Sequence, residues 1–145
     1  MTTDGTSKQP IASVEAHDAA VDRMVFQEFG AVVLVFRHIA VYHGTGIPYA
    51  VWSYRARLEI GGVSRVELSW RMYEHEDYVS DGWFAGNGRE DREWAALLGG
   101  RSIDGIHILF GSGRSLTAEC THAHLFLEEP LDHFGDWNEP LHGAR

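Results

Sequence analysis

Residues 52–72, which read WSYRARLEIGGVSRVELSWRM, indicate the fold class more directly than any other stretch of this chain. Apolar and polar residues alternate over positions 52–60 and again over 66–72, with Gly61 and Gly62 between the two runs. Alternation with a period of two is typical of β-strands that bury one face. The stretch therefore predicts an antiparallel hairpin, whose strands are joined by a three-residue loop that contains both glycines.

The charged residues of the hairpin predict its register. If the apolar residues of both strands lie on one face, Arg57 is opposite Glu67. The same register places Glu59 opposite Arg65. Opposite charges directly across a ladder contribute about 0.2–1 kcal/mol each. We therefore interpret the polar face of this hairpin as structural rather than ligand-binding.

Strand patterns also precede and follow the hairpin. Residues 21–28 and 31–43 alternate or are rich in β-branched residues, and they meet at a turn around Gly30. Residues 102–110 and 114–127 form a second pair of this kind. Together with the hairpin, these runs predict about six antiparallel strands. We expect a mainly β fold, either a partly open barrel or a sandwich.

The remaining stretches are expected to be helical or irregular. Residues 89–98 predict one helix, because Asn87 can cap its start and Gly99 can end it. On that helix, the apolar residues at helical spacing are expected to lie in the core. Residues 75–88 are polar and glycine-rich, which predicts a loop, and the chain beyond Pro130 is also expected to be irregular.

Length and composition set the expected domain organisation. A chain of 145 residues suits one domain. We expect a flexible tail at residues 1–13, followed by a single β-rich domain over residues 14–145. The chain has one cysteine, a polar beginning and no long apolar run. These features predict a cytoplasmic protein without an intramolecular disulfide.

The negative charge of the chain is concentrated in two segments. The sequence carries 12 basic and 21 acidic residues, a formal net charge of −9. Residues 72–88 and 115–144 contain acidic residues but no Lys or Arg, so the rest of the chain is close to neutral. Such a field attracts basic partners and repels nucleic acid and anionic membranes. We expect a basic protein partner, no nucleic-acid or membrane binding, and leave oligomer formation open.

These charges favour a non-catalytic binding module that recognises a basic protein surface, as an immunity protein or an inhibitor does. Aromatic side chains within the acidic segments would supply the anchors, because charges at the rim of an interface add little affinity. The candidate binding residues are Glu74, Glu76, Asp77, Tyr78, Asp81, Trp83, Glu129, Asp132, Asp136 and Trp137, with Phe84 and Phe134 as further aromatic candidates.

His17 and Asp18 open the first strand region. The order His-Asp-Ala-x-Val-Asp at residues 17–22, followed by a turn and a β-rich strand, resembles the start of small uncharacterised bacterial β-rich proteins. Some of those proteins are grouped with the immunity proteins of toxin systems, so the resemblance implies a binding function. From the residues alone, Asp18 is expected to turn the chain into the strand by accepting hydrogen bonds from backbone amides.

His122, His124 and Glu128 form a candidate metal site. Residues two apart in a strand point to the same side, so both imidazoles can bind one zinc or iron ion together with the carboxylate. The spacing His-x-His-x3-Glu-x6-Gly, which ends at Gly135, resembles the first signature of the cupin family of β-barrels. That resemblance implies a small metal-dependent enzyme or a metal-binding β-barrel. The second cupin signature has no match in this sequence.

A small-ligand-binding β protein is the third candidate function. Its pocket would be aromatic, built from Trp52, Tyr54 and Trp70. Cys120 lies on an alternating strand, which favours a small buried residue over a nucleophile. The sequence contains no phosphate-binding P-loop, dinucleotide fingerprint or nucleophile elbow.

Overall fold

The structure is a computed structural model, and it describes residues 9–28, 30–69 and 77–141. Antiparallel β-strands make up most of these ranges, as the alternating patterns predict. The strands are β1 (Ile11–Gln27), β2 (Ala31–His43), β3 (Tyr49–Gly61), β4 (Arg65–Ser69), β5 (Asp77–Gly86), β6 (Arg89–Asp91), β7 (Arg101–Ser102), β8 (Gly105–Phe110), β9 (Ser115–Glu119) and β10 (His122–Trp137). A single-turn 3₁₀ helix, η1 (Trp94–Leu97), lies between β6 and β7.

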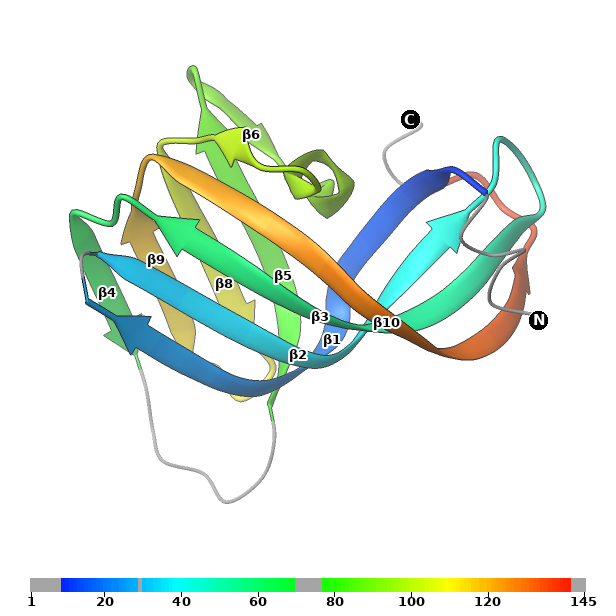
Figure 1. The fold of residues 1–145 in the computed structure, drawn as a ribbon, viewed down its shortest axis with the longest axis horizontal. Coiled ribbons are helices and arrows are strands. Elements are labelled where there is room, and N and C mark those ends of the chain that lie inside the picture. The colour runs from blue at the N-terminus through cyan, green and yellow to red at the C-terminus, as the bar shows by residue number, and fades with distance from the viewer. Residues whose placement is uncertain (1–8, 29, 70–76, 142–145) are drawn as a thin grey trace.

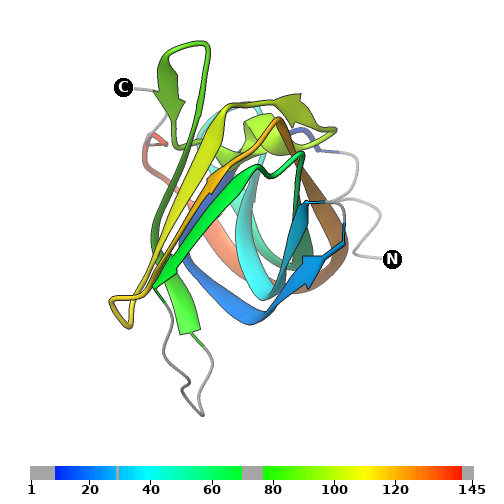
Figure 2. The same cartoon turned by 90° about the vertical axis from the view of Figure 1, so that its left-hand side faces the viewer.

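The strands join into one sheet in the order β4-β9-β8-β5-β1-β2-β3-β10-β7, with β6 paired to β5. This sheet folds over on itself without closing, so that β4, β9, β8 and β5 face the long strands β1, β2, β3 and β10 (Figures 1 and 2). The corner lies where β1 meets β5, through the pairs Ala20–Tyr78 and Val21–Asp77. The prediction of about six strands is wrong in number, because the described ranges contain ten.

The space between the two parts of the sheet holds the hydrophobic core. The alternating face of β3 lies in it, with Ala56, Leu58 and Ile60 fully buried as predicted. Trp94 and Leu97 of η1 are also fully buried, which confirms them as core residues. Each part of the sheet contributes large side chains; among them are Leu34, Phe36, Phe84, Ile106, Ile108, Leu116 and Leu125.

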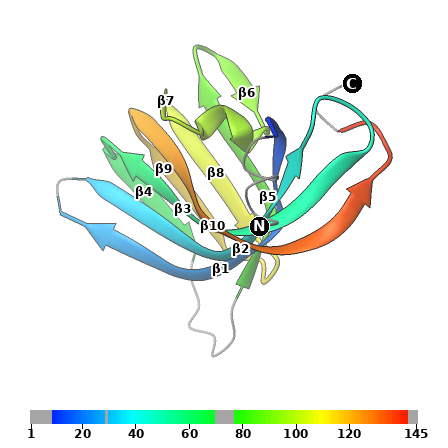
Figure 3. The same cartoon turned by 45° about the vertical axis from the view of Figure 1, so that its right-hand side comes forward.

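The four long strands extend past β5 into a second lobe, seen on the right of Figures 1 and 3, and the hydrophobic core continues into it through Val14, Ile39 and Val41. Their registers shift where they bend, for example between Phe36 and Ile39 of β2 and between Leu127 and Glu129 of β10. β-Bulges bend a strand and increase its twist. As a result, the first part of β1 turns away from β5, and grooves open along it.

The predicted 52–72 hairpin is wrong, because β3 and β4 do not pair with each other. β3 lies between β2 and β10, whereas β4 pairs with β9. The two glycines bend the chain instead of reversing it, and β9 and β10 follow the same bend. A Cβ atom on Gly62, where φ is +62°, would lie 1.9 Å from the Thr121 Oγ1 atom across that corner.

The predicted charge pairs are therefore wrong as well. Arg57 is opposite Val35 on one side and Phe126 on the other, not opposite Glu67. Charges pair along each strand instead: Arg57 Nε lies 2.9 Å from Glu59 Oε2, and Arg65 Nη2 lies 2.7 Å from Glu67 Oε1. The charged residues of β3 and β4 thus still have partners, but not across a ladder between these two strands.

The predicted helix over residues 89–98 is also wrong. The segment begins with β6, which pairs with β5, and its only helical part is η1. Glu93, not Asn87, caps η1, since its side chain accepts a hydrogen bond from the Ala95 N–H. Asn87 and Gly88 have φ values of 54° and 75°. Positive φ at both positions is the conformation for which Asn-Gly is favoured in a tight hairpin turn.

Three further boundaries differ from expectation. Residues 77–86, expected in a loop, form β5, whose Val79 and Phe84 are buried in the core. The chain beyond Pro130 continues as β10 to Trp137, and β1 already begins at Ile11 within the expected tail.

No helix in the described ranges is long and apolar enough to cross a membrane.

Candidate functional site

The candidate site is built around a bulge in β1, hereafter the β1 bulge (residues 15–19). The pairing of β1 with β2 shifts register between Glu15 and Ala20. Asp18 has a left-handed φ of 68°, which Asp tolerates better than most residues. His17 and Asp18 are exposed, whereas Ala16 and Ala19 on either side of them are buried. The bulge thus presents an imidazole and a carboxylate between two grooves.

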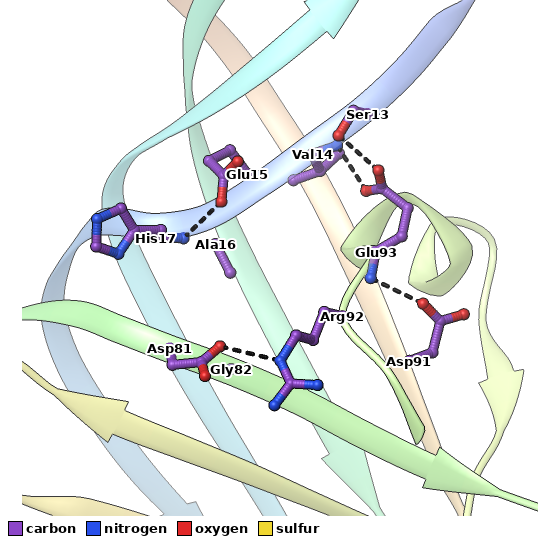
Figure 4. Close-up of a pocket in the computed structure, with 10 residues that line it drawn as sticks. All are labelled: Ser13, Val14, Glu15, Ala16, His17, Asp81, Gly82, Asp91, Arg92 and Glu93. Atoms are coloured by element: carbon purple, nitrogen blue, oxygen red, sulfur yellow. Dashed lines mark hydrogen bonds and ion pairs between the residues drawn. The ribbon is translucent and has the colours of Figure 1, made fainter. Parts of the chain in front are cut away.

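The first groove, the β1–β5 groove, has a volume of about 370 Å³ (Figure 4). It lies between β1, β5 and the chain just before η1. Asp81 in this groove lies 3.5 Å from the Nε atom of Arg92, and both side chains are partly exposed. The lining residues are Ser13, Val14, Glu15, Ala16, His17, Asp81, Gly82, Asp91, Arg92 and Glu93.

Two of the carboxylates in the β1–β5 groove have structural partners. Glu93 accepts hydrogen bonds from Ser13 Oγ at 2.5 Å and from the Val14 N–H at 2.9 Å, as Figure 4 shows. Asp91 accepts one from the Glu93 N–H at 2.9 Å. These bonds tie η1 to β1 and fix one wall of the groove. Glu15 and Asp81 have longer contacts, to the His17 N–H at 3.3 Å and to Arg92 at 3.5 Å, and are the carboxylates of this groove most accessible to a ligand.

His17 connects the β1 bulge to β5. Its Nδ1 atom lies 2.7 Å from the Ser80 carbonyl oxygen, and its Nε2 atom lies 3.5 Å from Asp18 Oδ2. The hydrogen bond to Ser80 raises the pKa of His17; slight burial lowers it, and the charges of Asp18, Glu15 and Asp81 raise it again, so that the pKa lies above its ordinary value. The acidic surroundings therefore favour the imidazolium form.

The second groove, the aromatic groove, lies on the other side of the bulge and has a volume of about 290 Å³. Its walls include Glu15, Asp18, Tyr42 of β2 and Trp137 of β10. The two aromatic rings meet edge to face, with centroids 6.0 Å apart and planes at 84°. Burial raises the pKa of Tyr42, and the nearby charge of Glu15 raises it further. Aromatic rings beside carboxylates suit a bound cation.

The structure brings members of the two predicted acidic segments to opposite sides of the β1 bulge. Asp81, from the first segment, lines the β1–β5 groove, and Trp137, from the second, lines the aromatic groove. Trp137 is 38% exposed, so its ring is available to a partner. Glu74 and Glu76 lie outside the described residues.

Asp77 is not part of this surface. Its carboxylate is buried, with Arg114 Nη2 and Ser112 Oγ both 2.6 Å from Oδ2. Burial by itself raises the pKa of Asp77, but hydrogen bonds from Ser112, Arg114 and the Tyr78 N–H outweigh that effect and lower the pKa below its ordinary value. The geometry gives Asp77 a structural role at the corner between β1 and β5.

Several of the other predicted binding residues line neither groove and have local partners. Trp83 stacks on His107, with ring centroids 5.2 Å apart. Asp136 lies 4.0 Å from His133, and the Asp132 N–H donates a hydrogen bond to Ser53 Oγ. Tyr78 and Glu129 are exposed on β5 and β10, and Phe134 is exposed too, while Phe84 is buried in the core.

The three candidate metal ligands on β10 contact other groups. His122 Nδ1 lies 3.0 Å from Thr121 Oγ1, and the His124 ring stacks on Phe126. Glu128 pairs with Arg57 at 3.1 Å. Within the part of the chain that the structure describes, no group of three or more His, Cys, Asp or Glu side chains is placed to hold a metal ion.

Two of the three residues of the predicted aromatic ligand pocket are described, and each contacts a histidine. Trp52 stacks on His133 with centroids 5.0 Å apart, and the buried Tyr54 hydroxyl lies 2.9 Å from His43 Nε2. Trp70 lies outside the described residues. Cys120 is buried as predicted, and burial, together with the charge of Asp104, raises the pKa of its thiol to about 11.

Sequence reasoning missed Glu15 and Tyr42, which complete the aromatic groove. Both lie in strands. A strand pattern predicts the backbone conformation, but it does not show which side chains of a bent strand line a groove. The available signal was the pair His17-Asp18, a polar pair within an apolar run, which breaks the regular alternation at the place where the bulge lies. Comparison with protein-family models, with curated proteins and with solved structures finds no match to this chain.

Proposed function

We propose that this protein is a non-catalytic binding module that recognises a basic protein surface at the β1 bulge, in the manner of an immunity protein or an inhibitor. The observation that supports it is the aromatic groove, where Tyr42 and Trp137 lie beside the carboxylates of Glu15 and Asp18. A lysine or arginine side chain of the partner would lie against the ring of Trp137, with its charge near the carboxylates.

The charge distribution supports the same proposal at longer range. The net charge of −9 would accelerate the approach of a basic protein, since complementary fields act mainly on the association rate. Affinity would then come from the aromatic anchor, because a few central aromatic or arginine contacts dominate most interfaces. The metal-site alternative has less support, because Glu128 is already paired with Arg57.

A basic peptide and its neutral isostere test this proposal. We expect a labelled peptide of alternating arginine and serine to bind, and the same peptide with citrulline in place of arginine to bind much more weakly. Trp137→Ala should remove the anchor and weaken arginine-peptide binding by about 30-fold, equivalent to about 2 kcal/mol. Fluorescence anisotropy measures both affinities.

Phe134→Ala is the matched control, because Phe134 is 65% exposed on the same strand but lines neither groove. This variant should bind like the parent protein. Equal binding of the citrulline peptide, or equal losses in the Trp137 and Phe134 variants, would contradict the proposed site.

The affinity for the arginine peptide should rise with pH through the pKa of His17. Deprotonation removes a positive charge next to Glu15, Asp18 and Asp81, so a bound guanidinium meets less repulsion. One charge at this range predicts an increase of about two- to five-fold. Folding stability should depend on pH in the opposite direction. Protonated His17 stabilises the folded state at low pH, and this stabilisation is lost as the pH rises through the folded-state pKa of His17.

His17→Gln provides the control for this pH effect. Glutamine keeps a polar side chain but has no proton to lose between about pH 5 and 8. Anisotropy titrations of the variant should therefore give an almost constant affinity over that range. If the variant shows the same rise in affinity as the parent protein, His17 is not the responsible group.

A further inference from the structure

A third cleft lies where the long strands bend, and its charge is opposite in character to that of the two grooves. It has a volume of about 560 Å³ and shares no lining residue with either groove. We refer to it as the arginine cleft. Its lining residues are Asp22, Arg23, Val35, Phe36, Arg37, Arg55 and Glu128.

The bend of the sheet explains how three arginines come together. Arg23, Arg37 and Arg55 lie on β1, β2 and β3, which are neighbours in the sheet. Arg37 falls within the register shift between Phe36 and Ile39, so it escapes the regular pairing of β2 with β3. Bulges of this kind re-aim side chains and are over-represented beside functional sites.

The acidic residues of the arginine cleft leave part of its positive charge uncompensated. Glu128 pairs with Arg57, outside the lining set, at 3.1 Å. Asp22 lies 3.9 Å from Arg37, and Arg37 has contacts beyond this pair, so the uncompensated charge is that of Arg23 and Arg55. For Arg23 and Arg55, the described residues supply no ion pair or hydrogen bond to the guanidinium group.

We propose that the arginine cleft binds a small molecule that carries a phosphate group. Guanidinium groups present their N–H donors in a planar fork that matches the oxygen atoms of a phosphate, and they stay charged at every physiological pH. A volume of about 560 Å³ is within the range of small-molecule sites and larger than a phosphate ion needs. The remaining space, beside the partly buried Val35, accommodates the organic group of a phosphate ester.

NMR titration with phenyl phosphate and with inorganic phosphate tests this proposal on the full chain. We expect phenyl phosphate to shift the Arg Nε–H resonances of the cleft and to bind more tightly than inorganic phosphate. The double variant Arg23→Gln, Arg55→Gln should weaken phenyl phosphate binding by about ten-fold or more, because hydrogen bonds to charged groups are among the stronger ones. Both arginines are exposed, and thermal unfolding checks that the variant is folded.

Arg65→Gln is the matched control, because Arg65 is an exposed arginine on β4 that pairs with Glu67 and does not line the arginine cleft. It should bind phenyl phosphate like the parent protein. The proposal is overturned if phenyl phosphate shifts no arginine resonance of the cleft, or if the double variant binds as tightly as the Arg65 variant. Tighter binding of a phosphoserine peptide than of phenyl phosphate would overturn the small-molecule assignment in favour of a phosphoprotein.

Discussion

Replacing Asp77 by alanine is expected to lower the free energy of unfolding by about 3–5 kcal/mol, the usual cost of breaking a buried ion pair. The side chains of Asp77 and Arg114 are 7% and 5% exposed. Arg114 donates to Asp77 Oδ2 from Nη2 at 2.6 Å and from Nε at 3.1 Å. Without the carboxylate, the buried guanidinium of Arg114 loses both of these charged hydrogen bonds. Urea unfolding, followed by tryptophan fluorescence, measures the change.

Asp81→Ala is the control for this prediction, because Asp81 is 42% exposed and pairs with Arg92 only at 3.5 Å. Its removal should change stability by less than about 1 kcal/mol. In arginine-peptide binding, the order should be reversed. Asp81→Ala should weaken binding, because Asp81 lines the β1–β5 groove, whereas Asp77 lies in the interior and its variant should bind with little change. An Asp77 variant as stable as the Asp81 variant would show that the ion pair does not hold the β1–β5 corner.

Asp77 also shows why the acidic segments were only partly interpretable from the sequence. The sequence shows a carboxylate among other carboxylates, with no basic residue nearby. Its partner Arg114 lies 37 positions away, and the fold brings it there by pairing β5 with β8. Charge counts therefore predict the sign of the surface potential, but they do not distinguish a surface carboxylate from a buried one.

The fold was predictable where a pattern reports only on local conformation. A run rich in β-branched residues identified β2 with its observed bounds. Alternation identified the buried face of β3, because a period of two follows from strand geometry itself. Strand partners were not predictable in this way. Gly61 and Gly62 suit a reversal as well as a bend, and the close approach of Thr121 and His122, which requires glycine at both positions, is visible only in the structure.

Turn and site residues show a related limit. Asn87 and Gly88 are a hairpin signal, yet Asn87 is also a good helix cap, and the acidic residues that follow suit the first turn of a helix. The helix predicted to begin at Asn87 does not form. Glu93 caps the short helix η1 instead, and its carboxylate also accepts hydrogen bonds from Ser13 and Val14. Contacts between β1 and η1 of this kind have no sequence signature.

Replacing Trp94 by alanine is expected to lower the free energy of unfolding by about 3–5 kcal/mol, the range for a large-to-small change at a buried aromatic residue. Trp94 is fully buried and packs edge to face on Phe36, with ring centroids 5.8 Å apart. Its Nε1–H donates a hydrogen bond to the Gly82 carbonyl oxygen at 3.3 Å. Its loss would leave a cavity between β5 and β2 and an unpaired carbonyl group.

Trp94→Phe separates the packing of the ring from its hydrogen bond. Phenylalanine keeps most of the apolar contact but cannot donate to Gly82, so its cost should be smaller than that of alanine by about 1–3 kcal/mol. Gly82→Ala tests the same contact from the other side, because a Cβ there would lie 2.6 Å from the Trp94 ring. Since Gly82 also lines the β1–β5 groove, Gly82→Ala should in addition weaken arginine-peptide binding while the protein remains folded. Urea unfolding measures the stability of each variant. Unchanged stability in Trp94→Ala would show that Trp94 does not hold β5 against the rest of the core.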